Sequence, residues 1–187
     1  GAALNAREEV TTNFTDLLDH FKRKIELGHE VDRLEPLFKD DQEYQMFLKD
    51  HNRHIVKRGE LSTYEGSCYL GIDAGSTTTK VALVNEKGDL LYSYYTNNNG
   101  NPLNATVEAL KEIHAQMPDT AHIVSSCSTG YGEHLIKAAL NLDYGEVETI
   151  AHYYAAAFFD PNVDCILDIG GQDMKCIKIK NGVVDNV

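Results

Sequence analysis

The feature of this chain that most constrains its fold is a change of hydrophobic periodicity near residue 66. Before it, apolar residues recur at offsets of three and four, the spacing of one helix face. After it, short apolar runs typical of strands, at 69–72, 80–84 and 90–95, alternate with helical stretches. We therefore expect a helical linker or docking segment at 1–66. An α/β domain at 67–187 would follow, with a mixed β-sheet flanked by helices.

Local signals place the elements of both parts. In the first part, apolar stripes predict a helix that ends at Gly28 and a second that begins near Asp41 and includes Ile55. In the second part, turn residues at 85–89 join two strands as a hairpin, and Pro102 starts a helix. Further helices are expected at 133–140 and 148–159, and further strands at 121–126, 165–169, 174–179 and 182–187.

Charge and cysteine content exclude several classes of protein. There are 17 basic and 29 acidic residues, a net charge of −12, which argues against partners such as nucleic acid or an anionic membrane. No run reaches the roughly 18 apolar residues of a membrane span, and we expect a cytoplasmic protein. The four cysteines show no CxxC spacing, and the strand-like runs around Cys127, Cys165 and Cys176 indicate small buried thiols.

The sharpest chemical signal lies between the first two expected strands, in the segment from Asp73 to Lys80. A glycine beside a run of hydroxyl residues lets the backbone approach a phosphate, and the hydroxyl and N–H groups can donate to it. Asp73 ends an apolar strand and could hold a hydrated Mg²⁺. No Walker sequence is present, and the alternative is an ordinary polar turn. The candidate phosphate-binding residues here are Gly75, Ser76, Thr77 and Thr78.

A second acid–glycine turn begins at Asp168, which again ends an apolar strand. Gly170 and Gly171 follow it before the chain returns as a strand. Two such turns could face each other across a cleft and hold a nucleotide's phosphates with a metal ion between them. Gln172 could position an attacking water, although a turn-capping role is equally compatible with its place in the sequence.

Two weaker signals complete the set. Gly130 and Gly132 lie in a strand-to-helix loop, where the start of the helix could face an anionic ligand. Glu148 and His152 are four residues apart and share one helix face. Such a pair is more often a surface contact than a metal site.

Taken in order, the segments 71–80, 129–132 and 168–175 resemble those of the nucleotide-binding lobe of actin-like ATPases, whose fold is ribonuclease H-like. Within that superfamily they are similar to the activator ATPases of 2-hydroxyacyl-CoA dehydratases and the ATPase subunits of benzoyl-CoA reductases. The resemblance places Asp73, Ser76, Thr77, Thr78 and Lys80 in the first phosphate loop. It places Asp168, Gly170, Gly171 and Gln172 in the second.

The resemblance also implies an activity. In these activators, ATP with Mg²⁺ drives electron transfer from a [4Fe-4S] cluster, held between two subunits, to a partner dehydratase or reductase. The cysteines of this chain do not match the family's cluster ligands, and we assign none of them to a cluster. The alternatives are a small-molecule kinase of the same fold and a non-catalytic ATPase-like scaffold.

The resemblance further suggests that the chain is part of a longer protein. It would hold one lobe and the first hairpin of the other. We expect such a piece to bind ATP weakly, to be inactive alone, and to form a homodimer through the hairpin at 165–187, whose apolar strand edges lack a sheet.

Overall fold

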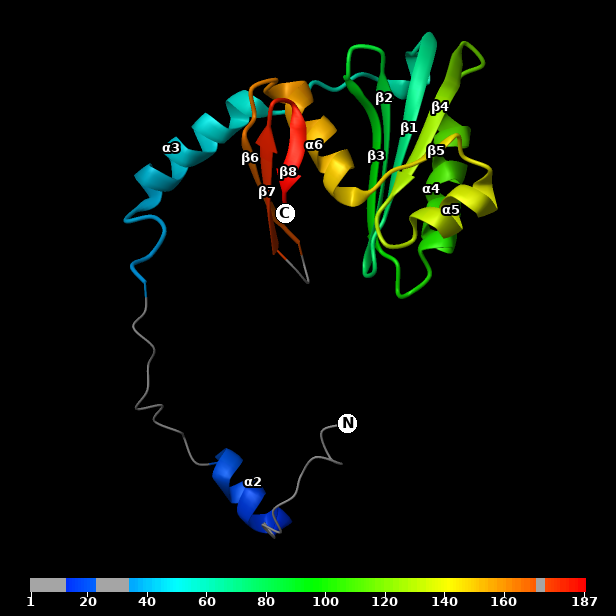
Figure 1. Ribbon diagram of the computed structural model, residues 1–187. Coiled ribbons are helices and arrows are strands. Elements are labelled where there is room, and N and C mark those ends of the chain that lie inside the picture. Colours follow the sequence, from blue (N-terminus) through cyan, green and yellow to red (C-terminus); the bar gives the residue numbers. More distant parts are fainter. Residues whose placement is uncertain (1–12, 23–33, 171–173) are drawn as a thin grey trace. The chain divides into compact units, whose positions relative to one another are not determined.

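The computed structural model describes residues 13–22, 34–170 and 174–187 (Figure 1). The chain divides into two units, 1–53 and 54–187. The first unit contains helix α2 (Phe14–Lys22) and helix α3 (Asp41–His51). Helix α3 begins at Asp41, as predicted, and Asp40 caps it, because its carboxylate accepts a hydrogen bond from the Glu43 N–H at 2.8 Å. The predicted helix end at Gly28 lies outside the described residues.

One expectation for the first unit is wrong. Ile55 does not continue the apolar stripe of α3, because the helix ends at His51 and the chain enters a 3₁₀ turn at Asn52–His54. The division between the units also comes earlier than position 66. Gly59 N donates to Leu90 O at 3.0 Å, and the side chain of Leu61 is buried in the core of the second unit. Residues 57–61 therefore pack with the α/β unit.

The second unit is built on a mixed five-stranded sheet in the order β3-β2-β1-β4-β5. The first three strands are antiparallel neighbours, β4 pairs with β1 in parallel and β5 pairs with β4 in parallel. The sheet is therefore mixed, as the sequence predicts. Register places Asp73 at the same level as Lys80 on one side and Thr129 on the other. The strands are β1 (Gly66–Ala74), β2 (Thr78–Asn85), β3 (Leu90–Asn97), β4 (Ala121–Thr129) and β5 (Tyr144–Gly145).

Two helices cover one side of this sheet, α4 (Pro102–Gln116) and α5 (Glu133–Leu140) (Figure 1). Ile113 and Ile136 are the fully buried isoleucines of these helices, and they pack with Ile72 and Leu83 from the sheet. Each such side chain contributes about 1.5–3 kcal/mol when it leaves water. This core packs against β1, whose carboxyl end carries Asp73.

A second sheet of three antiparallel strands follows helix α6 (Glu148–Phe159). Its strands are β6 (Cys165–Ile169), β7 (Met174–Lys180) and β8 (Val183–Asn186). Ile177 and Ile179 are buried on one face, whereas Leu167 and Ile169 are about 70% exposed on the other. No helix among the described residues is both long and apolar enough to cross a membrane.

The expectation that three cysteines are small buried thiols is wrong. Cys127 is half-buried on β4, and Cys165 and Cys176 are exposed. The last two alternate with buried or half-buried residues along β6 and β7, so they lie on the outward face of that hairpin. Cys68, for which no such prediction is made, is fully buried in the core of the five-stranded sheet.

Candidate functional site

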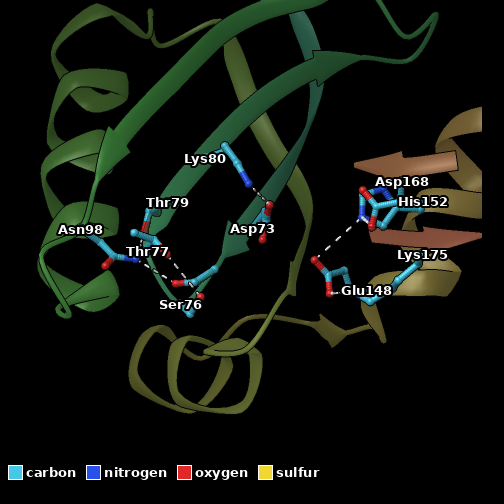
Figure 2. Close-up of polar contacts among 11 residues, drawn as sticks. Asp73, Ser76, Thr77, Thr79, Lys80, Asn98, Glu148, His152, Asp168 and Lys175 are labelled. Carbon is cyan, nitrogen blue, oxygen red and sulfur yellow. Dashed lines mark hydrogen bonds and ion pairs between the residues drawn. The ribbon is translucent and has the colours of Figure 1, made fainter. Parts of the chain in front are cut away.

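The carboxylate of Asp73 stands at the carboxyl end of β1, directly across the ladder from Lys80 (Figure 2). Lys80 Nζ donates to Asp73 Oδ2 at 2.8 Å. The other carboxylate oxygen, Oδ1, is buried and has no hydrogen-bond partner among the described residues. A buried acceptor without a donor is costly, and a cation or a cation-bound water would satisfy it.

The turn after Asp73 is a tight connection between β1 and β2. A Cβ atom on Gly75 would lie 2.8 Å from Thr78 O, so the turn closes only with glycine at this position. Ser76 and Thr77 are exposed, and their hydroxyl oxygens lie 3.4 Å apart. Thr78 is half-buried where β2 begins. The hydroxyl groups of Ser76 and Thr77 thus stand together at the surface of the turn.

Asn98, which the sequence reasoning missed, holds this turn in place. Its side chain is 5% exposed, and Nδ2 donates to Gly75 O at 2.8 Å and to Thr79 Oγ1 at 3.4 Å (Figure 2). Its backbone N–H donates to Thr77 O at 2.9 Å. The only sequence signal is its place in the asparagine-rich run 97–101, because asparagine side chains bond readily to turn backbone.

The glycine loop after β4 packs against the same turn. Gly130 has a φ of +86°, and a Cβ atom there would lie 2.6 Å from Asp73 Oδ1 and 2.9 Å from Ala74 O. The N–H of Gly132 donates to Ala74 O at 2.8 Å. The parallel pairing of β1 with β4 produces this contact, since the carboxyl ends of the two strands lie at the same edge of the sheet. Two of the three predicted segments therefore meet.

The loop is also tied to the segment that leads into α6. Thr129 Oγ1 donates to Glu146 O at 2.8 Å, and Glu146 N donates to Ser128 O at 2.9 Å. Helix α6 begins two residues later, at Glu148. The backbone that supports the first turn thus continues into the helix that carries the second group of charges.

That second group gathers around Asp168, at the end of β6. His152 Nε2 lies 3.5 Å from Asp168 Oδ2 and 3.9 Å from Glu148 Oε1. Lys175 Nζ is 2.9 Å from Glu148 Oε2 (Figure 2). One potential ligand atom from each of Glu148, His152 and Asp168 lies within 4.8 Å of the other two, and such a donor set can bind a divalent cation. The sequence pairs Glu148 with His152 but gives no sign that Asp168 joins them.

A cavity of about 530 Å³ opens beside Asp73 and Lys80. Its lining includes Thr129 on β4, Ala151 on α6 and apolar sheet residues such as Val81. Asp168 is not among the described residues of this lining. A pocket shared by Asp73 and Asp168 therefore stays a prediction.

The structure describes only some of the predicted residues of the second turn. Gly170 follows β6 and is exposed. Gly171 and Gln172 lie outside the described residues. Their predicted roles in phosphate binding and water positioning stay predictions.

Comparison with known proteins gives a consistent result. A model of the BadF/BadG/BcrA/BcrD ATPase family matches residues 70–187. The (R)-2-hydroxyglutaryl-CoA dehydratase activating ATPase of Acidaminococcus fermentans is 32% identical over 121 residues, which are 63% of this chain and 44% of that relative.

Solved structures agree with this match. Component A of (R)-2-hydroxyglutaryl-CoA dehydratase from Acidaminococcus fermentans superposes with a TM-score of 0.53 at 29% identity, covering 65% of this chain and 46% of that one. The activator of the 2-hydroxyisocaproyl-CoA dehydratase from Clostridium difficile, with bound ADPNP, gives a TM-score of 0.55 at 26% identity and covers 64% and 44%. The likeness confirms the predicted α/β class, an actin-like ATPase lobe with a mixed sheet flanked by helices. The chain spans less than half the length of these relatives.

Proposed function

This chain belongs to the BadF/BadG/BcrA/BcrD ATPase family, and we propose that it supplies a phosphate-binding lobe of an ATP-dependent activator of a 2-hydroxyacyl-CoA dehydratase or a related CoA-ester reductase. Two relatives are named as the activating ATPase and the activator of such dehydratases, which supports a partner enzyme of this class. The observation that carries the proposal is the Asp73 turn, which the Asn98 side chain and the Gly130 loop hold from two sides.

In this proposal the first turn binds the phosphates of ATP. The hydroxyl groups of Ser76, Thr77 and Thr78 and the turn's N–H groups would donate to phosphate oxygens. Lys80 would contribute a positive charge from the adjacent strand. Asp73 would hold Mg²⁺ through water, and its buried, unpartnered Oδ1 fits that role. When bound, Mg²⁺ would neutralise phosphate charge and orient the phosphates.

The second turn would act on the same phosphates. Asp168 would contribute to the Mg²⁺ site, Gly170 and Gly171 would allow close approach of the backbone, and Gln172 would position the attacking water. The described contact that supports this part is the 3.5 Å approach of His152 to Asp168, which orients the carboxylate.

An iron–sulfur cluster does not fit the cysteines of a single chain. A [4Fe-4S] cluster takes four thiolates, whereas Cys68 is buried in the core and Cys127 lies on another strand of that sheet. Only Cys165 and Cys176 lie close together among the described residues. Electron transfer to the partner enzyme is part of the proposal, but none of its steps is assigned to these cysteines.

A homodimer and a cytoplasmic location complete the proposal. The dimer is supported by the exposed apolar side chains of Leu167, Ile169 and Met174 on the β6–β7 hairpin. Light scattering across a concentration series would show a dimer mass, and a monomer at every concentration would contradict it. The alternatives of a small-molecule kinase and a scaffold have no contact in their favour among the described residues.

The phosphate-binding role can be tested on the 187-residue chain by a titration with Mg²⁺ and ADPNP, followed by amide chemical shifts in NMR. We expect saturable shifts at residues 75–79 and at Gly130, with weak affinity. The Asp73→Asn variant should weaken the apparent affinity about tenfold, or about 1.4 kcal/mol. Asp119→Asn removes the same charge at an exposed position outside the turn and should leave the titration unchanged.

Two results would contradict this role. One is the absence of shifts in the Asp73 turn at saturating nucleotide. The other is an Asp73→Asn variant that binds as tightly as the unmodified chain while remaining folded. A fold check by amide spectra of the free variants separates loss of binding from loss of structure.

A further inference from the structure

Two thiols lie next to each other on the outward face of the β6–β7 hairpin. The sulfur atoms of Cys165 and Cys176 are 3.7 Å apart, and both residues are exposed. They come from neighbouring antiparallel strands at diagonal positions of the ladder, since Cys165 stands opposite Lys178 and Cys176 opposite Leu167. The other cysteines are placed differently, with Cys68 buried and Cys127 half-buried on β4.

This geometry suits a bond between the two sulfurs. A disulfide has an S–S length of about 2.05 Å, so the sulfurs must approach by roughly 1.6 Å. Diagonal neighbours on a ladder are about 7–8 Å apart, so this approach includes a small movement of the two strands as well as side-chain rotation. The strand ladder already holds the two residues close together. The second thiol therefore attacks a mixed disulfide on the first at a much higher effective concentration than any thiol in solution. Exposure of both thiols gives a small reagent access to either sulfur.

We propose that Cys165 and Cys176 form a reversible dithiol–disulfide site that is oxidised by low-molecular-weight disulfides such as oxidised glutathione. The thiolate of one cysteine attacks a sulfur of the reagent, the reagent's S–S bond breaks, and one reagent thiol leaves. The thiolate of the other cysteine then attacks the protein sulfur of the mixed disulfide and releases the second reagent thiol. The two cysteines lose two electrons and two protons, and the reagent is reduced to two thiols.

The site is separate from the charged group on the same hairpin. Side chains alternate along β6, so Cys165 and Leu167 lie on the outward face while Asp168 lies on the other, within 3.5 Å of His152. Oxidation therefore needs no change in the Asp168 contacts. The thiols share the outward face with Leu167, which the proposed dimer would cover, so oxidation is measured at a concentration where light scattering gives a monomer mass.

The surroundings of Cys165 set the pH dependence of the reaction. The hydrogen bond with Cys176 raises the pKa of the Cys165 thiol, the nearby Asp164 raises it further, and Lys178 opposes this. The attacking species is the thiolate. Oxidation should accelerate as pH rises toward this raised pKa.

The test uses the reduced 187-residue chain incubated with excess oxidised glutathione. We expect two of the four thiols to be lost, no glutathione to be retained, and the mass to fall by that of two hydrogen atoms. Peptide mapping should join the peptides of Cys165 and Cys176, and dithiothreitol should restore both thiols.

Variants make the assignment specific. The Cys127→Ser variant should still lose two thiols, because Cys165 and Cys176 on the hairpin are both intact. Cys176→Ser should instead retain one glutathione on Cys165, because no second thiol is near enough to release it. Glutathione retained on both hairpin cysteines of the unmodified chain, thiols that do not react, or bonds formed only with Cys68, Cys127 or another chain would each overturn the proposal.

Discussion

Asp73 and Asp168 occupy equivalent positions in two hairpins. Each stands directly across an antiparallel ladder from a lysine seven residues later, Lys80 in the first hairpin and Lys175 in the second. In the first, the lysine binds the aspartate opposite it at 2.8 Å. In the second, Lys175 binds Glu148 at 2.9 Å, and His152 lies 3.5 Å from Asp168.

The difference comes from what packs against each hairpin. Beside Asp73 lies the Gly130 loop, which contributes backbone and no charge. Beside Asp168 lies α6, which contributes a carboxylate and an imidazole one helical turn apart. In both hairpins, a spacing of seven residues places an aspartate opposite a lysine. The element that packs against each hairpin decides which ion pairs these side chains form. Four predictions test this contrast.

The largest effect is expected where the first hairpin meets its neighbour. Gly130→Ala places a Cβ atom 2.6 Å from Asp73 Oδ1 in a backbone conformation with positive φ. We expect a loss of about 3 kcal/mol or more in the free energy of unfolding, measured by urea denaturation, and loss of the ADPNP-induced shifts.

Gly100→Ala is the matched control for that variant. Gly100 also has a positive φ, +79°, but a Cβ atom there would meet nothing within 4 Å. The free energy of unfolding of this variant should fall by about 1–2 kcal/mol, which is the cost of a left-handed backbone conformation for alanine. Equal losses in the two variants would show that the close approach of the Gly130 loop does not matter.

The next effect concerns the side chain that holds the first turn. Asn98→Ala removes the donor to Gly75 O and leaves that carbonyl without its partner. The expected cost is about 2 kcal/mol in urea denaturation, together with a weaker ADPNP titration. Asn104→Ala, an exposed position at the start of α4, should cost less than about 0.5 kcal/mol. If the two variants behave alike, Asn98 does not hold the turn.

A smaller effect tests the exchange of partners in the second hairpin. Double-mutant cycles should give a coupling of about 0.5 kcal/mol between Lys175→Met and Glu148→Gln, because both side chains are partly exposed. Coupling between Lys175→Met and Asp168→Asn should be smaller. The cycle of Lys80→Met with Asp73→Asn serves as the reference from the first hairpin. A larger coupling of Lys175 with Asp168 than with Glu148 would remove the contrast.

The smallest effect concerns the strand that carries the Gly130 loop. Hydrogen bonds from the Ser126 hydroxyl and N–H lower the pKa of Asp143 below its ordinary value of 3.8. A lowered pKa in the folded state adds stability above the unfolded value, and this is lost as pH falls through the lowered pKa. Asp143→Asn should therefore be less stable than the unmodified chain at about pH 7.

The gap in stability between the two chains should be narrower at about pH 3 than at about pH 7, since the stabilisation is lost progressively as pH falls below 3.8 and through the lowered pKa. Urea midpoints at both pH values measure this difference. Asp119→Asn, at an exposed position, should show no such convergence. A pH-independent gap between the Asp143→Asn variant and the unmodified chain would contradict the assignment.

Much of the second unit could be predicted from its sequence. Helices α5 and α6 and strand β6 have the bounds that their apolar patterns predict, and the hairpin turn at 85–89 lies where glycine and asparagine indicate it. The position of the Asp73 turn also follows from the sequence, because a glycine in a run of hydroxyl residues is a local chemical signature. These features depend on residues that are neighbours in the chain.

Other features could not be predicted in this way. Asn98 is over twenty residues from the turn it holds, and only the pairing of β2 with β3 brings it there. The cysteines of β6 and β7 lie in strand-like sequences. Alternation of side chains between the two faces of a strand does not show which face packs against the rest of the protein. The place of residues 57–61 in the α/β unit depends on Leu90, which is even more distant in the sequence, 31 residues after Gly59.

The amino-acid sequence on its own determined the order of strands and helices and the two acid–glycine turns, because these follow from periodicity and from residues a few positions apart. Tertiary structure alone decided that Gly130 lies against Asp73, that Lys175 binds Glu148, and that two thiols face outward together. Each of these depends on a distance between residues far apart in the chain, and only the packed sheets and helix α6 set those distances.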